Sequence, residues 1–408
     1  MHLDTITELL NLQNYKAGVA INTDDRIYVV LERIEDTPPI CSGCGKVQVH
    51  GMSVHSRDVV IVEDLGILGK RVFLTVPKRK IKCVEDGTIR VEEIPWIRNR
   101  FTDRFAEQVY RLTSITTNQE AGWFLGLDDE TVYRIDKSKL EELALEKLDP
   151  TPAPKQMSVD EVAWQKWHKY VTNVVDIDQK KVIWNHNGRG KITLDKFFRS
   201  LGKENCENIE AVACDGAKGY LSSIKHYAKE ALVVLDHFHV KKYLNDAVDT
   251  VRKEELKKAR QQQNGELSEI LHCNKRFILM QNTVTRKKQN LLERLSSLNE
   301  KVYQAMLLKE QFVAIYKDHK TAHRSLKEWI VAAIRSNIPA FVALGKKFFR
   351  KRHYVLNYFR HQITTAISEG INNKIKRLSR MAYGYKNVSY FLIKMHQHCG
   401  LLNPRLST

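Results

Sequence analysis

The stretch Met157-Ser158-Val159-Asp160-Glu161-Val162 begins the part of the sequence that decides the fold. Short runs rich in β-branched residues favour strands, and amphipathic runs between them favour helices. The runs that favour strands lie at residues 157–162, 170–177, 181–185, 209–214 and 232–235, and those that favour helices lie at residues 194–201 and 220–228. The first three strands follow one another directly, which predicts an antiparallel meander, and the other two alternate with helices.

The order of three strands, helix, strand, helix and strand is typical of an RNase H-like α/β fold. Charged, helix-forming sequence with almost no strand signal then extends over residues 240–355, and a final helical stretch begins near Ile363. The sequence therefore predicts an α/β domain that a long helical insertion interrupts.

Two different patterns precede this domain. Short β segments broken by Gly and Pro cover residues 20–95. Helical patterns follow over residues 102–148, where Thr117 and Glu120 have capping-box spacing and Gly126 separates two helices. Three helices with a tight turn that contains glycine predict a helix-turn-helix.

The chain is thus predicted to be a multidomain α+β protein. The proline-rich segment 150–154 cannot continue a helix and predicts a linker. The predicted parts are a β-rich N-terminal module (1–98), a helix-turn-helix (99–148), a linker (149–155), the RNase H-like α/β domain (156–240 and 356–395) and its helical insertion (241–355).

Composition limits the partners of the chain. Its 408 residues carry 66 Lys and Arg against 48 Asp and Glu, and the net charge of +18 favours a polyanionic partner such as nucleic acid. No apolar stretch approaches the roughly 20 residues that cross a bilayer. Because the N-terminus also lacks the features of a secretory signal, we expect a protein that stays inside the cell and has no membrane span.

Two acidic residues stand out by their positions on predicted strands. Asp160 lies in the first strand among residues that favour burial, and Asp215 ends the fourth strand and precedes Gly216. The two strands are neighbours in the predicted order. A carboxylate at the carboxyl end of such a strand lies where α/β sites tend to form.

A third acidic residue, Glu369, lies on the final helix. It shares one helical face with Asn373, Lys376 and Arg380, which places a carboxylate among groups that bind phosphate. Asn373 and Lys376 are therefore predicted to support the site. Two neighbouring residues of the same helix, Lys374 and Arg377, are predicted DNA contacts.

The carboxylate oxygens of Asp160, Asp215 and Glu369 suit Mg²⁺, and two divalent ions promote phosphodiester cleavage without a protein nucleophile. From spacing alone, other interpretations stay open. Asp160 can cap a turn, Asp215 can cap a helix and Glu369 can be a solvated helix residue. Three further acids compete with these: Asp176 and Asp178, which fit an ordinary hairpin turn, and Asp236, which ends a strand.

These acids lie in segments that resemble the transposases of the ISL3 family of insertion sequences. The resemblance extends from the region of Cys41 to about Asn387. The segments that carry it are Ser158-Val159-Asp160-Glu161, Ala213-Cys214-Asp215-Gly216-Ala217, Leu235-Asp236-His237-Phe238-His239-Val240, Glu369-Gly370-Ile371-Asn372-Asn373-Lys374-Ile375-Lys376 and Tyr383-Gly384-Tyr385. Several motifs in a fixed order are far more specific than any one of them.

The resemblance implies a DNA transposase of the DDE type. Asp160, Asp215 and Glu369 are then the catalytic acids and hold Mg²⁺ or Mn²⁺ in an RNase H-like domain. The resemblance gives Asp236 and His239, near the start of the insertion, a supporting role without metal ligation.

Such an enzyme binds the terminal inverted repeats of its insertion sequence, cleaves the ends by metal-dependent phosphodiester hydrolysis and transfers the 3′-hydroxyl ends to target DNA. Because two ends must be held together, we expect a homo-oligomer. Its expected location is the cytoplasm of a prokaryote, in association with the nucleoid. An RNase H-like nuclease that acts on branched DNA, and a non-catalytic DNA-binding regulator derived from a transposase, are the alternatives.

Cysteines of the N-terminal module suggest a metal site. Cys41 and Cys44 have the spacing of a zinc knuckle, and Cys83 supplies a third thiolate, so we predict a structural Zn²⁺. Relatives commonly supply a second C-x-x-C pair, whereas this chain has Asp86 three residues after Cys83. The candidates for the fourth ligand are His50, His55 and Asp86. A metal-free β module is the alternative.

Basic residues mark two further candidate DNA contacts. Arg134 and Lys137, with Lys139 beside them, lie on the third predicted helix of the helix-turn-helix, for which a helical spacer is the alternative. A second cluster precedes the final helix and consists of Lys346, Lys347, Arg350, Lys351 and Arg352. It is either a solvated helical face or a DNA track.

Overall fold

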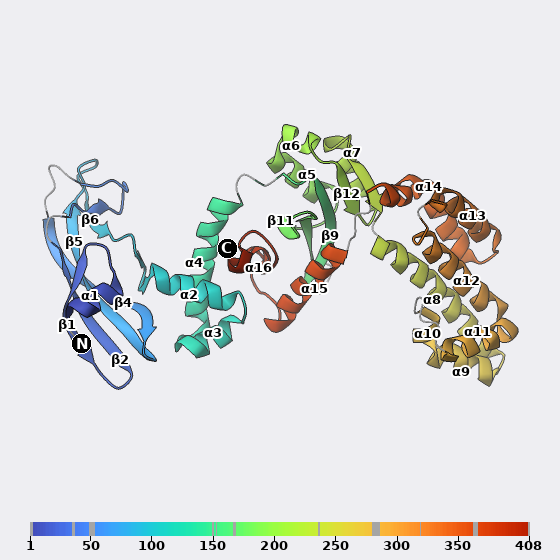
Figure 1. The fold of residues 1–408 in the computed structure, drawn as a ribbon, viewed down its shortest axis with the longest axis horizontal. Coiled ribbons are helices and arrows are strands. Elements are labelled where there is room, and N and C mark those ends of the chain that lie inside the picture. The colour runs from blue at the N-terminus through green and yellow to red at the C-terminus, as the bar shows by residue number, and fades with distance from the viewer. Residues whose placement is uncertain are drawn as a thin grey trace. The chain divides into compact units, whose positions relative to one another are not determined.

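The computed structural model describes residues 3–34, 37–48, 54–148, 151, 153–165, 169–235, 237–279, 286–318, 320–361 and 366–406. The chain divides into two compact units, one of residues 1–145 with 404–408 and one of residues 146–403. Figure 1 labels the elements of both units. No helix in the described ranges is long and apolar enough to cross a membrane.

The first unit begins with one helix and a sheet. Its elements are α1 (Leu3–Leu10), β1 (Tyr15–Asn22), β2 (Arg26–Arg33), β3 (Ile40–Cys41), β4 (Val54–Ile67), β5 (Lys70–Lys82), β6 (Ile89–Glu93), β7 (Ile97–Arg98) and β8 (Phe101–Thr102). The strand order is β1-β2-β5-β4-β8-β7, and β6 pairs with β3 and β5. Alternate residues of β5, namely Val72, Leu74 and Val76, are fully buried in the core under α1, as expected for a strand with one covered face.

Three helices follow in the same unit: α2 (Asp103–Thr113), α3 (Asn118–Leu125) and α4 (Asp129–Lys147). The predicted capping box begins α3, because the Thr117 hydroxyl accepts the Glu120 N–H at 3.2 Å and the Glu120 carboxylate accepts the Thr117 N–H at 3.0 Å. Gly126 ends α3 with a positive φ of 68°, a conformation that glycine adopts without strain. These local signals fix the tight turn between α3 and α4.

A five-stranded sheet forms the centre of the second unit. Its strands are β9 (Gln156–Gln165), β10 (Lys169–Asp176), β11 (Lys181–Asn187), β12 (Ala211–Cys214) and β13 (Leu232–Leu235), in the order β11-β10-β9-β12-β13. The first three pair antiparallel, whereas β12 is parallel to both β9 and β13. The predicted meander and the predicted succession of strands and helices are both present.

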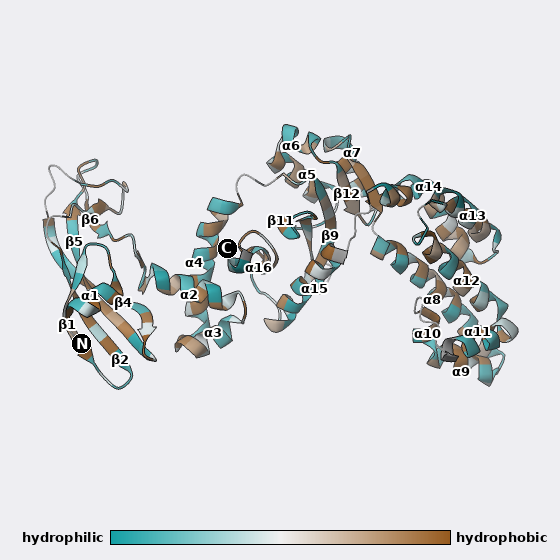
Figure 2. Cartoon of the chain, in the orientation of Figure 1, coloured by the Kyte–Doolittle hydropathy of each residue, from teal (hydrophilic) through white to brown (hydrophobic). Residues whose placement is uncertain are grey.

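Helices cover both faces of this sheet (Figure 1). One face packs on α5 (Lys191–Leu201), α6 (Lys203–Glu207) and α7 (Lys218–Tyr227), and the other on α15 (Ala366–Met381) and α16 (Val388–Cys399). Residues of β9 alternate between the faces, with Val159 toward the first and Val162 toward the second. Because β12 is buried on both faces, all its residues are apolar (Figure 2).

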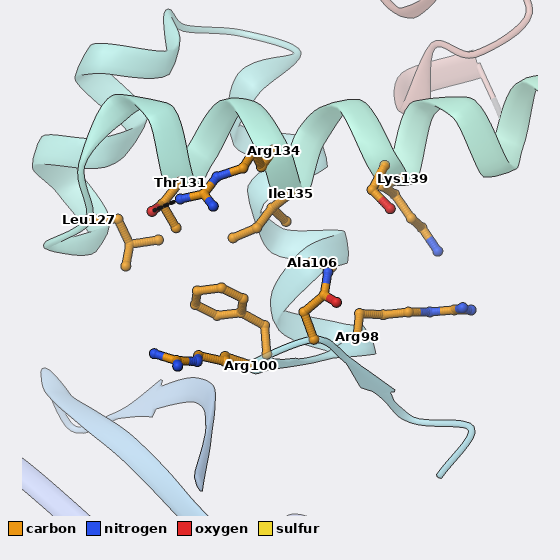
Figure 3. A pocket seen from close by; sticks show the side chains of 11 residues that line it. Arg98, Arg100, Ala106, Leu127, Thr131, Arg134, Ile135 and Lys139 are labelled. Atoms are coloured by element: carbon orange, nitrogen blue, oxygen red, sulfur yellow. Dashed lines mark hydrogen bonds between the residues drawn. The ribbon is translucent and has the colours of Figure 1, made fainter. Parts of the chain in front are cut away.

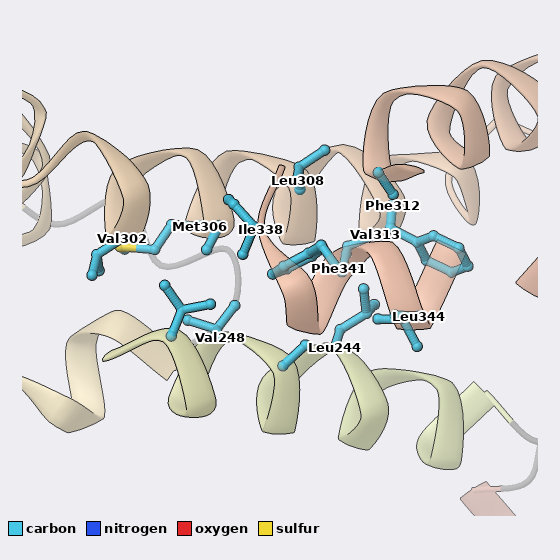
Figure 4. Packing of buried hydrophobic residues seen from close by; sticks show 14 of the residues in the cluster. Leu244, Val248, Val302, Met306, Leu308, Phe312, Val313, Ile338, Phe341 and Leu344 are labelled. Atoms are coloured by element: carbon cyan, nitrogen blue, oxygen red, sulfur yellow. The ribbon is translucent and has the colours of Figure 1, made fainter. Parts of the chain in front are cut away.

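Between β13 and α15 the chain forms a helical insertion. Its helices are α8 (His237–Gln261), α9 (Gly265–Cys273), α10 (Lys275–Leu279), α11 (Arg286–Leu298), α12 (Glu300–Ile315), α13 (Ala322–Arg335) and α14 (Pro339–His361). Leu244 and Val248 of α8, Phe312 of α12 and Phe341 of α14 meet in one core (Figure 4). Pro339 occupies the first position of α14, where a missing N–H costs nothing. A short 3₁₀ helix, η1 (Pro404–Leu406), follows α16.

Candidate active site

Asp160 lies in the middle of β9, and Asp215 directly follows the end of the neighbouring strand β12. The parallel register pairs Ser158 of β9 with Ala213 of β12, and each acidic residue follows its paired residue by two positions. Ala213 packs in the small core that also contains Ile367 of α15. Because side chains alternate along a strand, both carboxylates belong to the sheet face that α15 covers.

Contacts with α15 fix the Asp160 carboxylate. Asn372 donates its side-chain N–H to Asp160 Oδ2 at 2.5 Å, and one turn earlier the hydroxyls of Ser158 and Ser368 share a hydrogen bond. His239 of α8 holds its Nε2 atom 3.6 Å from Asp160 Oδ1. The Asp160 side chain nevertheless keeps 27% of its surface exposed, so a substrate or ion can reach it.

Glu369 lies in the first turn of α15, three residues before Asn372, and is exposed. At 3.6 residues per turn, Glu369 and Lys376 flank Asn372 on the same side of the helix. The helix therefore presents both groups along the side that contacts Asp160. Asn373 is exposed. Its side chain is turned by about 100° around the helix from that of Asn372.

The remaining basic residues of α15 lie on other sides of the helix. Arg377 is exposed opposite the buried face formed by Ile371 and Ile375. Lys374 is exposed near α16: burial raises the pKa of the Cys399 thiol to about 11, and the nearby Lys374 charge opposes that shift. Of the three basic residues predicted to support the site or bind DNA, Lys374, Lys376 and Arg377, only Lys376 lies on the Asn372 side.

Sequence reasoning missed Asn372 and Glu161 as members of this cluster. Glu161 accepts a hydrogen bond from the Tyr220 hydroxyl at 2.6 Å. Burial raises the pKa of Glu161, the Tyr220 hydrogen bond opposes the shift, and the charges of Asp215 and Asp160 raise it further. Glu161 therefore faces α7 on the opposite side of the sheet from Asp160, and its carboxylate interacts with the two aspartates only through their charges. The sequence did contain a signal for both residues. Glu161 directly follows Asp160, and Asn372 lies on the apolar side of its helix, which packs on the sheet.

The structure describes one residue of the predicted supporting pair at the start of the insertion. His239 contacts Asp160, whereas Asp236 lies outside the described residues. His237 is half-buried against the rings of Tyr316 and Tyr358, and this burial lowers its pKa to about 4. His237 is therefore a neutral core residue at physiological pH.

A second cluster lies in the first unit, where one ligand atom from each of Cys41, Cys44 and Cys83 falls within 4.8 Å of the others. All three cysteines are free thiols, and two of them are buried. Soft thiolates at this spacing suit Zn²⁺. The exposed His55 begins β4, and His50 lies outside the described residues.

The two segments that supply these cysteines have the same backbone conformation. Gly45 N–H donates to Cys41 O at 2.8 Å and Cys41 N–H to Lys46 O at 3.0 Å. The second segment repeats both bonds, from Gly87 to Cys83 O at 2.9 Å and from Cys83 to Thr88 O at 2.8 Å. The two glycines have φ values of 69° and 68°. Asp86 therefore occupies the position that corresponds to Cys44.

The sulfur contacts follow the same repeat. The N–H groups of Gly43 and Cys44 donate to the Cys41 sulfur and lower the pKa of that thiol. The N–H groups of Asp86 and Glu85 likewise donate to the Cys83 sulfur, but burial and the hydrogen bonds with the other two thiols leave the pKa of Cys83 raised. The Asp86 carboxylate binds Arg90 at 2.8 Å, so it must turn to reach an ion among the sulfurs.

A cleft of about 720 Å³ lies within the first unit between the β7–β8 turn and α4. Figure 3 shows Arg134 of α4 and Arg100 on opposite walls of this cleft. Among the described residues, no carboxylate lies within ion-pair distance of either guanidinium. Lys139 also lines the cleft but lies 3.9 Å from Asp103, and Lys137 lies 3.8 Å from Glu141.

Comparison with known proteins identifies relatives that match most of the chain. A family model described as a transposase, of the ISL3 group, matches residues 157–395, which is more than half of the chain. The transposase for insertion sequence element IS1001 of Bordetella parapertussis is 31% identical over 363 residues, which cover 87% of each protein. The transposase for insertion sequence element IS1557 of Mycobacterium tuberculosis is 25% identical over 340 residues, 78% of this chain and 76% of the relative.

Proposed function

This chain belongs to the ISL3 family of insertion-sequence transposases, and we propose that it cuts the ends of its own element and joins them to target DNA. The observation that carries the proposal is the convergence of Asp160 and Asp215 on adjacent parallel strands with α15, which carries Glu369. In this proposal the sheet and its covering helices form an RNase H-like catalytic domain that α8–α14 interrupt.

The acid cluster fits divalent cations such as Mg²⁺ or Mn²⁺. Asp160, Asp215 and Glu369 offer hard carboxylate oxygens. Burial raises the pKa of the neighbouring Glu161, and the charges of Asp215 and Asp160 add to that shift. When bound, two such ions supply an activated nucleophile and stabilise the leaving oxygen. Asn372 donates to Asp160 Oδ2, whereas Oδ1 accepts the Glu161 N–H at 2.7 Å and lies 3.6 Å from His239 Nε2.

The reaction needs no covalent protein intermediate. Hydrolysis of a phosphodiester at the element's end frees a 3′-hydroxyl, which then attacks a phosphodiester of the target and releases a 3′-hydroxyl there. The role of the protein is to bind and orient these groups in a site that β9, β12 and α15 hold rigid. Both ends must be present together, so we propose a homo-oligomer, acting in the cytoplasm at the nucleoid.

The proposal is tested with purified protein and duplexes that carry the ends of the element encoding it. We expect Mg²⁺-dependent cutting at the element boundary and, with added plasmid, joined strand-transfer products. A branched duplex of unrelated sequence is the control substrate. Cutting of the branched DNA without boundary cutting or joining would instead establish a nuclease, and binding without cutting in Mg²⁺ or Mn²⁺ would establish a regulator.

We further propose that the three helices α2–α4 bind DNA as a helix-turn-helix, through the cleft that Arg100 and Arg134 line. The first turn of α4 is acidic, with Asp129 and Glu130, so its tip repels phosphates. No carboxylate of the described residues lies within ion-pair distance of Arg100 or Arg134, although the charge of Arg134 acts on Asp128. Lys137, in contrast, lies 3.8 Å from Glu141. This supports a phosphate contact through the cleft.

Removal of these two arginines should weaken DNA binding in a salt-dependent way. We expect Arg100→Ala and Arg134→Ala each to lower the slope of log affinity against log salt by about 1. Fluorescence anisotropy with an end duplex at several salt concentrations measures the slope. The matched control is Arg111→Ala on α2, because Arg111 is exposed and already paired with Glu107 at 2.8 Å. Equal slopes for all three variants would contradict this DNA contact.

Finally, we propose a structural Zn²⁺ held by Cys41, Cys44 and Cys83, with Asp86 as the fourth ligand. The repeated backbone turn supports Asp86 over the exposed His55, because Asp86 stands where the first turn carries Cys44. The ion would join the segments around β3 and β6 and take no part in catalysis.

A further inference from the structure

Two donors of the helical insertion hold the loop that carries Asp215. The Tyr243 hydroxyl of α8 donates to Asp215 O at 3.2 Å, and the Lys351 ammonium of α14 donates to Gly216 O. Gly216 has a positive φ of 74°, and a Cβ atom at this position would lie 2.9 Å from Lys351 Nζ. The glycine therefore leaves room for a lysine directly beside the acid cluster.

Lys347 lies one turn before Lys351 on the same side of α14. Its ammonium is 3.0 Å from the centre of the Tyr243 ring, and both lysines are half-buried. Burial lowers the pKa of Lys347 to about 8, with a further contribution from Lys351, whereas Asp215 and Asp246 oppose the shift. No carboxylate of the described ranges lies within ion-pair distance of either ammonium.

This arrangement is costly without an anionic ligand. Taking an ammonium out of water is unfavourable unless a counter-charge is present. The charge of Asp215 opposes the fall in the pKa of both lysines, and Asp246 also acts on Lys347. The other basic residues of the same stretch differ, because Lys346 and Arg350 are exposed to solvent.

We propose that Lys347 and Lys351 form a phosphate-binding subsite for the DNA strand that enters the acid cluster. The ligand is a backbone phosphodiester close to the one that is cut. The proposal rests on the proposed transposase function, and it gives the insertion a specific task. Through Tyr243, Lys347 and Lys351, the insertion positions both the Asp215 loop and the strand beside it.

The test combines lysine variants with neutral phosphates. Binding of an end duplex is measured without metal, with a single methylphosphonate placed at each phosphate around the boundary in turn. We expect Lys347→Ala to reduce affinity roughly threefold to tenfold and to lower the salt slope by about 1. At one or two positions the methylphosphonate should weaken binding by the wild type but not by Lys347→Ala, because that variant has already lost the contact with this phosphate.

Lys351→Gln serves as the second variant, because its amide N–H can still donate to Gly216 O after the charge is removed. The matched control is Lys346→Ala, which should keep every methylphosphonate effect of the wild type. The proposal is overturned if the Lys347 and Lys351 variants bind with the wild-type slope, or if every methylphosphonate effect persists in them. Cutting by the wild type in Mg²⁺ is assayed in parallel. Absence of cutting would contradict the proposed transposase function, whereas the binding data alone test the phosphate subsite.

Discussion

Asp160→Asn and Asp215→Asn should each reduce end cleavage by about three orders of magnitude or more, because several kcal/mol of transition-state stabilisation is lost with a metal ligand. DNA binding should persist, since both substitutions nearly preserve the volume of the side chain and neither removes a basic residue. The amide introduced by Asp160→Asn also keeps an oxygen that can accept the hydrogen bond from Asn372. The measurements are single-turnover cleavage in Mg²⁺ and anisotropy with the same duplex.

Glu369→Gln belongs in the same series, because its position beside Asn372 predicts an equally severe loss of cutting. The matched control is Asp178→Asn, which removes an exposed carboxylate from the hairpin turn between β10 and β11 of the same sheet. That variant should cut at the wild-type rate. A substituted acid that still supports wild-type cutting is not a metal ligand, and such a result for Glu369 would redirect the search to Glu161.

The order of elements in the second unit was predictable because its signals are local. Runs of apolar and β-branched residues mark β9 to β13, and the linking helices carry amphipathic patterns. The neighbouring positions of Asp160 and Asp215 followed from that order. The bounds shifted by a few residues, as with α5, which begins at Lys191 and not at Leu194.

The partners of these acids were harder to predict, because they depend on the rotation of α15. The sequence favoured Asn373 as a supporting residue, whereas Asn372 contacts Asp160. The packing of Ile371 and Ile375 decides this rotation, and a shift of one residue turns a side chain by about 100°. The contact of Lys351 with the Asp215 loop was harder still to predict, because its hydrogen bond to Gly216 joins residues 135 positions apart.

The role of Asp86 as a zinc ligand was only partly predictable from the sequence. The sequence offered it as one of three candidate zinc ligands, and no local pattern separated it from His50 or His55. A usable signal was nevertheless present, because a glycine follows both Cys44 and Asp86. Only the backbone bonds reveal that both glycines end the same turn.

Removal of Zn²⁺ should strongly lower the stability of the first unit. Zinc contributes about 10–16 kcal/mol to folding in small finger peptides. This unit has its own core under α1, so we expect local opening and not complete unfolding. Chelation, or Cys83→Ser, should make the segments 37–48 and 83–93 sensitive to protease and leave the second unit protected. Metal content, limited proteolysis and mass spectrometry measure these effects.

The fourth ligand is tested by substituting Co²⁺, whose visible absorption reports tetrahedral geometry and thiolate number. Asp86→Ala should weaken binding and disturb the tetrahedral spectrum, whereas Asp86→Cys should tighten binding and add a fourth thiolate signal, because zinc-type sites favour soft ligands. Cys273→Ser is the matched control, since Cys273 is exposed on α9 in the other unit. An unchanged spectrum in Asp86→Ala, with loss of it in His55→Ala, would assign the fourth position to the histidine and contradict the equivalence of the two turns.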